Sequence, residues 1–368
     1  MTSSQIIVLA TPLFLALIAL EWAVGVARGR NTYRLADAIS SIGLGALSQV
    51  SGVLVRVFAI GLYTLAYEHV ALVRLPASAL WVWLAALVGY DLCYYAYHRA
   101  GHRVAVLWAA HAVHHQSEDY NLSTALRQTS SGFLFGWLFY LPLAVLGVPP
   151  PVFAAVALID LLYQYWVHTE QIGRLGWFDR WFCAPSNHRV HHAVNDRYLD
   201  RNYGGILIVW DRLFGTFVEE DASEPCVYGT RTPLRSWNPL WANLQVYGEL
   251  ALDSWRARSW ADKLRVWLAA PGWRPADVAA RWPKPAFDLT RVERYDPPLA
   301  RRAAWAAALL FVAMLAASLL FLWNAHRLDG WQTAGGVLGI GALLWAIAAL
   351  TTPRPARAAL RAADRPLV

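Results

Sequence analysis

The chain has 368 residues, of which 57% are hydrophobic and only 15% charged, and its formal net charge is +7. Soluble domains average about a quarter charged residues, so this composition excludes an ordinary soluble protein. The arginines are dispersed between apolar segments without a recognition motif, which argues against nucleic-acid binding; we interpret the charge as loops that face anionic lipid. Three widely separated cysteines, Cys93, Cys183 and Cys226, predict neither a disulfide framework nor a zinc ribbon.

The first two predicted elements are apolar segments long enough to cross a bilayer. Residues 6–27 are apolar apart from Glu21. Because no Lys or Arg precedes them and no clear cleavage site follows, we interpret them as a retained span and not as a signal peptide. Residues 39–67 form a second span, rich in Gly and Ser, which suits close helix contacts. Arg56 within it is expected to face the bundle interior or to snorkel.

Three further apolar segments surround the first histidines. Residues 76–97 are a predicted span that delivers His98 at its end. Residues 130–148 and 152–167 follow, joined by three prolines that stop one helix and open the next. The second of this pair is short, so the two are either spans or a hairpin that turns back inside the membrane. In either case the chain returns to the membrane face from which it entered, so His168 should emerge on the same side of the membrane as His115.

The remainder of the chain is a polar region followed by two more spans. Residues 169–302 contain no run long enough to span, although 213–218 and 255–270 are predicted interfacial elements. Residues 303–323 and 334–351 are the last spans, and a basic tail follows, with Arg354, Arg357, Arg361 and Arg365. Seven crossings would place the tail in the cytoplasm and leave only Arg74 and Arg327 in external loops, as the positive-inside rule requires.

These elements predict an all-α fold, a polytopic integral membrane helical bundle with a cytoplasmic, histidine-rich cap that holds two metals. We expect residues 1–301 to form one membrane domain with a catalytic core at about 76–218. Residues 302–368 would then be a two-helix membrane appendage with the basic tail.

Of the eleven histidines, eight lie in three sequence clusters and a ninth lies alone between two of these clusters. The clusters are HRAGH (His98, His102), HAVHH (His111, His114, His115) and HRVHH (His188, His191, His192), with His168 between the last two. Positions three and four apart share a helix face, so we expect each cluster to present its imidazoles on one surface. A lone buried histidine is usually a core residue, but three clusters without a ligand are improbable. One ion cannot use eight or nine imidazoles, which favours two metals. His69 and His326 fall outside and receive no role.

The kind of metal is open on these residues alone, because imidazole ligands suit zinc, iron or copper. The HExxH pattern typical of zinc hydrolases is absent from the sequence. A two-metal site at the cytoplasmic ends of apolar helices suits a lipid whose chain stays in the bilayer. Oxygen chemistry at two irons attacks unactivated C–H bonds, and lipid chains offer such bonds.

The clusters, in this order and spacing, resemble the fatty acid hydroxylase/sterol desaturase superfamily of membrane di-iron enzymes. The segments WAAHAVHHQSEDYNLSTALRQ and HRVHHAVNDRYLDRNYGGILIVWDRLFGTF resemble its alkylglycerol monooxygenase branch, and the likeness covers residues 91–217, with a weaker echo in PGW at 271–273. The resemblance implies two irons, O2, and hydroxylation of a lipid C–H bond. One candidate for that bond is at the ether-adjacent carbon of an alkylglycerol, where the hydroxylated product would collapse to an aldehyde and an alcohol. It implies the eight cluster histidines and His168 as ligands, Glu118 as a catalytic residue, and tetrahydrobiopterin or another external electron donor.

Polar residues near the clusters are candidates for supporting roles. Glu118, Asp119, Asn121 and Arg127 could orient imidazole N–H groups, or Asp119 and Asn121 could simply begin a capped helix. On the other side we expect Asn187, Asp196, Asn202 and Asp211, the last paired with Arg212 or an imidazole. Asp91 and Asp160 are costly in lipid and should face the site, reaching His98 and His168 through tyrosines or water. Tyr94, Tyr95 and Tyr97 predict an interfacial belt.

Three alternatives compete with this interpretation. The nearest is a sterol or fatty-acyl desaturase or hydroxylase, since the same site can serve either outcome. The second is a metal transporter, but transport sites usually lie near the bilayer midplane, whereas these histidines lie at helix ends. The third is an inactive scaffold, against which the intact ligand set argues. For the enzyme, the expected partners are a lipid substrate, O2, the bilayer and an external electron donor, with no nucleic acid.

Overall fold

The computed structural model describes residues 2–352, without the side chains of residues 3 and 56–59. The Arg56 side chain and the four arginines of the tail therefore lie outside the described residues. Within 2–352 the secondary structure is helical, and the only β pairings are two isolated bridges, Phe182–Leu207 and Ala193–Tyr228. The all-α prediction is confirmed.

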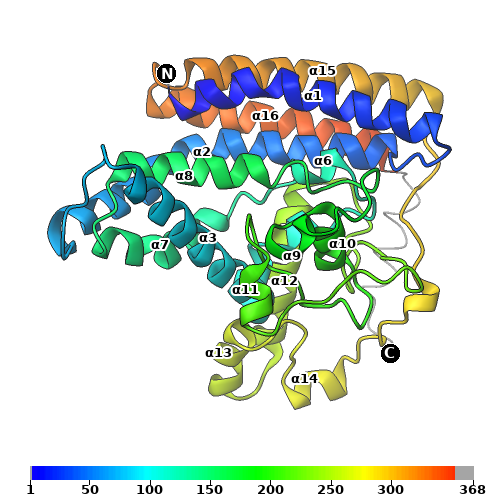
Figure 1. The fold of residues 1–368 in the computed structure, drawn as a ribbon. Coiled ribbons are helices and arrows are strands. Elements are labelled where there is room, and N and C mark those ends of the chain that lie inside the picture. Colours follow the sequence, from blue (N-terminus) through cyan, green and yellow to red (C-terminus); the bar gives the residue numbers. More distant parts are fainter. Residues whose placement is uncertain (1, 353–368) are drawn as a thin grey trace.

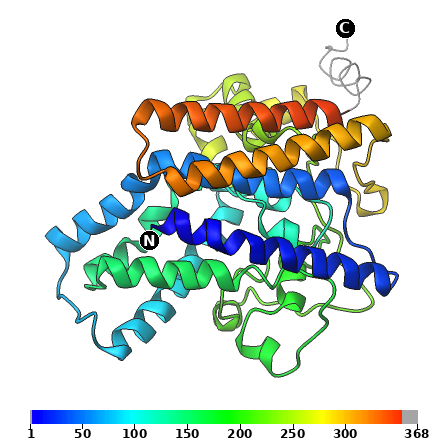
Figure 2. The ribbon, with the colours of Figure 1, turned by 90° about the horizontal axis from the view of Figure 1, so that it is seen from above.

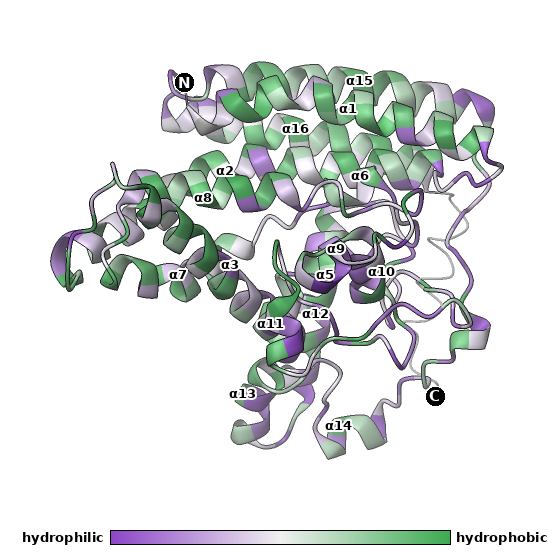
Figure 3. Ribbon diagram, in the orientation of Figure 1, coloured by the Kyte–Doolittle hydropathy of each residue, from purple (hydrophilic) through white to green (hydrophobic). Residues whose placement is uncertain are grey.

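Four long helices form the membrane layer. They are α1 (Ser3–Ala27), α2 (Leu35–Val70), α15 (Arg301–Asn324) and α16 (Gly330–Thr351). Figures 1 and 2 show them side by side, and Figure 3 shows that they are predominantly hydrophobic. A shared core of α2, α15 and α16 includes Ile39, Met314 and Leu344. Large apolar side chains such as Leu13 and Leu309 stay exposed on the outside, which in this layer is the surface that lipid covers.

A second group of helices packs against α2 on the other side. It consists of α3 (Leu80–Arg103), α7 (Gly136–Val145) and α8 (Pro150–Tyr163), and Tyr63 of α2 is buried among them. The proline turn behaves as predicted, because Pro149 precedes α8 and Pro150 and Pro151 open it. The group encloses the end of α3 that carries the first histidine cluster.

The lengths and compositions of these helices show that the prediction of seven membrane crossings is wrong. Among residues 2–352, four helices are long and apolar enough to span, namely α1, α2 over Leu35–Val55, α15 and α16. At 1.5 Å per residue, the 10 residues of α7 and the 14 of α8 fall short of a bilayer core of about 30 Å. The helix α3 has 24 residues, but it carries Asp91 and the HRAGH cluster in place of a continuous apolar run. The segments 76–97, 130–148 and 152–167 therefore pack beside the layer as shorter or more polar helices.

Short helices and loops build the cap that lies beneath the layer in Figure 1. In chain order they are α4 (Ala105–Ala109), α5 (Ala112–His115), α6 (Leu122–Ala125), the 3-10 turn η1 (Gly132–Leu134), α9 (Phe178–Trp181), α10 (Pro185–His192), α11 (Val209–Leu213), α12 (Pro239–Arg256), α13 (Trp260–Leu268), α14 (Ala276–Arg281) and the 3-10 turn η2 (Leu289–Arg291). A small core of Ala105, Ala109, Leu250 and Val266 ties α4 to α12 and α13. On its other side α13 exposes Trp260, Leu264 and Leu268. The cap is thus mostly loop, held by short apolar contacts.

Candidate metal centre

Nine imidazoles from four parts of the chain converge between the end of α3 and the cap. The last turns of α3 carry His98 and His102, the turn around α5 carries the HAVHH cluster, the segment after α8 carries His168, and α10 carries the HRVHH cluster. His111 is partly buried and the other eight are buried. His69 and His326 are exposed and lie elsewhere, at the end of α2 and after α15.

The nine imidazoles form two groups. One contains His98, His102, His111, His115 and His191, and the other contains His114, His168, His188 and His192. Within each group, one ring nitrogen per residue lies within 4.8 Å of those of all the other members. The groups adjoin, since the rings of His115 and His192 stack with centroids 4.3 Å apart. Two clusters of nitrogen donors of this size match the ligand sets of two metal ions.

Each HxxHH cluster is divided between the two groups, so the expectation of three imidazoles on one surface is wrong. The residues that stay together are four apart: His111 with His115, and His188 with His192. The residue three positions after the first, His114 or His191, joins the opposite group. Both helices are short, so the angular difference between spacings of three and four is enough to direct neighbouring rings to different ions.

Backbone carbonyls fix the orientation of four rings. Each ring has its Nδ1 at hydrogen-bond distance from a carbonyl oxygen: His98 from Tyr203 (2.8 Å), His114 from Arg127 (2.8 Å), His168 from Gln164 (2.8 Å) and His191 from Arg201 (3.0 Å). A proton on Nδ1 leaves Nε2 as a free lone pair, which is the usual arrangement of a metal-binding imidazole.

The Nε2 atoms converge without protein partners that would satisfy them. Those of His98 and His111 lie 3.1 Å apart, those of His114 and His168 lie 3.2 Å apart, and those of His168 and His188 lie 3.1 Å apart. The buried Nε2 atoms of His102, His191 and His192 have no hydrogen-bond partner. Buried polar atoms are normally satisfied, and facing lone pairs repel unless a cation or proton lies between them. The residues therefore fit bound metal.

Burial also keeps the imidazoles in the ligand form. Removal from water lowers the pKa of His98 to about 3, and that of His114 to about 4. The neighbouring imidazoles lower the pKa of His192 further, since two adjacent rings cannot both carry charge at little cost. All three rings are neutral at physiological pH, and a neutral imidazole is the species that binds a metal.

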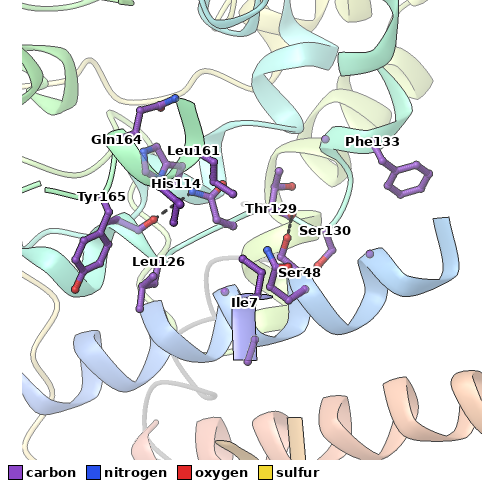
Figure 4. A pocket seen from close by; sticks show the side chains of 18 of the residues that line it. Ile7, Ser48, His114, Leu126, Thr129, Ser130, Phe133, Leu161, Gln164 and Tyr165 are labelled. Atoms are coloured by element: carbon purple, nitrogen blue, oxygen red, sulfur yellow. Dashed lines mark hydrogen bonds between the residues drawn. The ribbon is translucent and has the colours of Figure 1, made fainter. Parts of the chain in front are cut away.

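An apolar cavity reaches both groups. It has a volume of about 450 Å³ and lies between the membrane layer and the metal centre. Its lining includes Ile7 of α1, Leu315 of α15, His98 and His111 of the first group, and His114 and His168 of the second. Figure 4 shows His114 and Leu161 on one side of it, with Ile7 and Ser48 on another. A lipid chain in this cavity would lie against apolar helices while one of its carbons faces the imidazoles.

Comparison with known proteins agrees with this geometry. The family model described as fatty acid hydroxylase matches residues 83–216, a range that contains all nine imidazoles of the two groups. Residues 83–216 therefore form a fatty acid hydroxylase domain.

Three proteins with similar sequences accompany this domain match. It is 40% identical to alkylglycerol monooxygenase of Homo sapiens, over 72% of this chain and 59% of the relative, and 37% identical to that of Xenopus tropicalis, over 78% and 64%. It is 34% identical to the ornithine lipid hydroxylase OlsE of Rhizobium tropici, over 33% of this chain and 38% of the relative. The chain thus spans less than two thirds of the length of the alkylglycerol monooxygenases, and no solved structure matches it. The resemblance predicted from the histidine clusters is confirmed.

In this hydroxylase domain, Arg127 holds the second group as predicted. Its carbonyl oxygen accepts from His114, and its guanidinium Nε donates to the carbonyl of Val113 at 2.7 Å. The Arg127 side chain is buried, and its remaining N–H groups face Ser40, Ser41 and Gln116. A buried guanidinium therefore clamps the turn that carries HAVHH.

The other polar residues after HAVHH hold neighbouring segments of the chain in place. Asn121 accepts from Ser123 N–H and begins α6, so the capped-helix interpretation holds for it. Asp119 pairs with Arg34 at 2.9 Å. The carboxylate of Glu118 accepts from Tyr295 N–H at 2.5 Å and lies 3.9 Å from Arg34 Nη2. These contacts join the HAVHH segment to the start of α2 and to the segment before α15; a catalytic role for Glu118 stays a prediction.

On the other side of the centre, Asp211 supports His98 indirectly. It accepts from the N–H groups of Tyr203 and Gly204, at 2.8 and 2.7 Å, and so fixes the carbonyl that holds His98. The expected pairing of Asp211 with Arg212 or an imidazole is wrong. Asn202, in the left-handed region at φ 55°, donates to the carbonyls of Asn187 and Val218. Asp196 instead lies at the surface, paired with Arg231.

Sequence reasoning missed Asp200. Its Oδ1 lies 3.5 Å from Nδ1 of His102, and its backbone is in the left-handed region at φ 57°. This contact gives His102 a carboxylate partner where four other rings have carbonyls. The available signal was an Asp a few residues after HRVHH, within a segment rich in turn formers.

Asp91 and Asp160 support the histidines by routes other than those expected. Asp91 accepts from Ile206 N–H, Leu207 N–H and Trp210 Nε1, which anchors the segment after Tyr203. Asp160 accepts from the Gln164 amide at 2.6 Å, and the Gln164 carbonyl holds His168. The expected bridges through tyrosine do not occur among these contacts.

The predicted tyrosine belt is wrong for at least one member. Tyr95 is buried, and its hydroxyl pairs with that of Thr216 at 2.9 Å inside the protein. Tyr94 and Tyr97 line the cavity. The three tyrosines thus support the cap and the cavity, because α3 packs beside the layer and is covered there.

Proposed function

We propose that the chain is a membrane-bound, non-haem di-iron monooxygenase that hydroxylates a lipid C–H bond, with an alkylglycerol attacked at its ether-adjacent carbon as substrate. The observation that carries the proposal is the apolar cavity whose wall includes imidazoles of both groups. The relatives named alkylglycerol monooxygenase support the lipid class.

The chain's own residues would divide the work as follows. The five-histidine and four-histidine groups would hold one iron each. Two bound irons would supply the activation of O2 that an unactivated C–H bond requires. The apolar lining from α1, α2 and α15 would bind the chain and exclude water, and the carbonyls of Tyr203, Arg127, Gln164 and Arg201 would hold the ligands in place. Electrons would come from an external donor such as tetrahydrobiopterin.

The cytoplasmic placement of the centre is supported by arginines at one end of the layer. Arg28, at the end of α1, donates to the Gln171 carbonyl of the cap, and Arg34, before α2, pairs with Asp119. Arg301 and Arg302 open α15. Under the positive-inside rule, the end of the layer that contacts the cap faces the cytoplasm. The division at residues 301 and 302 into a catalytic domain and an appendage stays a prediction.

A sterol or fatty-acyl desaturase or hydroxylase is the second candidate, favoured by the domain match alone. A transporter is disfavoured because the imidazoles come from α3 and the cap, and none from the four candidate spans. The experiment that tests the proposal is oxygen consumption by purified, iron-loaded protein with an alkylglycerol and a reduced pterin. We expect a fatty aldehyde and glycerol as products; an alkylglycerol hydroxylated in mid-chain with its ether bond intact, or ion flux without oxygen use, would contradict it.

A further inference from the structure

The wall of the cavity formed by α2 and the segment after Arg127 is unexpectedly polar. Gln49 of α2 lines the cavity, and its amide has no hydrogen-bond partner among the described residues. Gln128 donates to the Ala125 carbonyl through its Nε2, which leaves its Oε1 free. The Ser130 hydroxyl is buried without a partner. Figure 4 shows Ser48, Thr129 and Ser130 together on this side of the cavity.

Unpaired polar groups beside an apolar cavity are costly, and Gln49 lies within a candidate span. The Ser130 hydroxyl is buried, and a buried hydroxyl without a partner costs about 1–3 kcal/mol. Polar residues inside membrane segments are rare and usually serve a ligand. Ser48 Oγ, next to Gln49, already donates to the Thr129 carbonyl at 2.7 Å and so spends its proton on the protein. Gln49 keeps its amide group, and Gln128 keeps its Oε1, available for a molecule in the cavity.

This polar wall is tied to both groups of imidazoles. Gln128 follows Arg127, whose carbonyl lies 2.8 Å from His114 Nδ1. Further along the same segment, the Gly132 carbonyl accepts from Tyr97, the residue before His98, at 3.4 Å. The segment that presents the polar groups therefore also positions one imidazole of the four-histidine group and contacts the helix of the five-histidine group.

We infer that Gln49, Gln128 and Ser130 bind the free hydroxyl groups of a glycerol ether while its alkyl chain follows the apolar lining. The inference rests on the proposed function, since it names how that substrate is oriented. In a glycerol ether only a few bonds separate the hydroxyl groups from the ether-adjacent carbon, so a polar wall in the same cavity as imidazoles of both groups fits oxidation at that carbon. A lipid oxidised in mid-chain would place its polar end far from the metals.

The test compares two lipids and two variants. The lipids are a hexadecyl glycerol monoether and the same ether with both hydroxyl groups methylated. The variants are Gln49→Leu, which removes the amide at similar size, and Ile42→Leu, a shape control on the same helix and the same cavity. Binding to iron-loaded protein is measured without oxygen, and KM and kcat are measured with oxygen and a reduced pterin.

We expect Gln49→Leu to weaken binding and raise KM for the free monoether about tenfold, the loss of roughly one good hydrogen bond, and to leave the methylated ether within about twofold. Ile42→Leu should change both lipids alike. Equal effects of Gln49→Leu on the two lipids, or none, would overturn the inference. The wild-type protein separates the two claims: preferential binding of the free monoether without turnover would refute the proposed function and keep the inference, whereas turnover without that preference would do the reverse.

Discussion

The Nδ1 atom of His114 lies 2.8 Å from the carbonyl oxygen of Arg127, and the guanidinium of Arg127 returns to the carbonyl of Val113, the residue before His114. This closed exchange joins the turn that carries HAVHH to a buried cation. The Arg127 side chain is 1% exposed, so neither end of the exchange can be replaced by water.

Arg127→Met should disturb the four-histidine group selectively. It removes the donors to Val113, Ser40 and Ser41, and leaving their oxygens unpaired costs on the order of 1–3 kcal/mol each in a buried site. We expect a lower unfolding midpoint and the loss of about one iron per chain, from the four-histidine group. Arg174→Met, at an exposed ion pair with Glu219, is the matched control and should change neither quantity. Unaltered iron content in Arg127→Met would contradict the clamp.

Glu118 offers a test of catalysis against positioning. Glu118→Gln keeps an acceptor for Tyr295 N–H but removes the charge near Arg34, and Glu118→Ala removes both. If Glu118 acts by holding the segment before α15, the Gln variant should keep most of its turnover and the Ala variant should lose it about tenfold. Both should retain two irons. Equal loss of kcat in the two variants would instead show that the reaction needs an ionisable carboxyl, as the family resemblance predicts.

The metal-free protein should be less stable in mild acid than at neutral pH. Without metal, the pKa values of His98 and His114 lie at about 3 and about 4, below the value of about 6.5 for an unfolded imidazole. The unfolded chain then binds more protons as the pH falls below 6.5, so each such residue costs about 1 kcal/mol of folding stability at pH 5.5 and nothing at pH 7.5. We expect the chelated protein to melt at a lower temperature at pH 5.5 than at pH 7.5, whereas the drop caused by chelation itself should be similar at the two pH values, because the buried imidazoles stay neutral at both. Tryptophan fluorescence on heating measures it, and an equal melting temperature of the chelated protein at the two pH values would refute the burial of neutral imidazoles.

The exposed face of α13 predicts contact with the membrane surface. Trp260, Leu264 and Leu268 are 80%, 68% and 68% exposed and lie one turn apart on one side of the helix. An apolar stripe of this kind on a helix that also carries basic residues is typical of an interfacial element, as predicted for residues 255–270. Trp260→Ser with Leu264→Ser should raise KM several-fold for a lipid presented in anionic vesicles and leave turnover in detergent unchanged. A loss of the same size in detergent would indicate damage to the cap instead.

Sequence reasoning captured the meeting of the histidines and missed how they divide. The four-residue spacing and the return of the chain through 130–167 were enough to predict that His98, His168 and His188 meet. The assignment of His114 and His191 to opposite groups depends on the length and tilt of one-turn helices, which no periodicity reports. The supporting roles of Asp200 and Asp211 depend on loops whose left-handed residues only tertiary contacts can fix.

The number of spans was predicted wrongly for a related reason. Hydropathy identifies apolar segments, but it does not show whether they cross lipid or pack on a neighbour. One apolar face of α7 and α8 is buried against α2 and α3, where Tyr63, Leu143 and Val152 share a core. The cavity also escaped prediction, because its wall joins residues as distant in sequence as Ile7, His114 and Leu315.

Iron bound per chain is the most direct measure of the central claim, that nine imidazoles hold two ions in two adjacent groups. Purified protein should contain two irons; His191→Ala, in the five-histidine group, and His114→Ala, in the four-histidine group, should each retain about one, and exposed His69→Ala should retain two. A single metal in the unaltered protein, or the same loss from His69→Ala as from the other two, would contradict it.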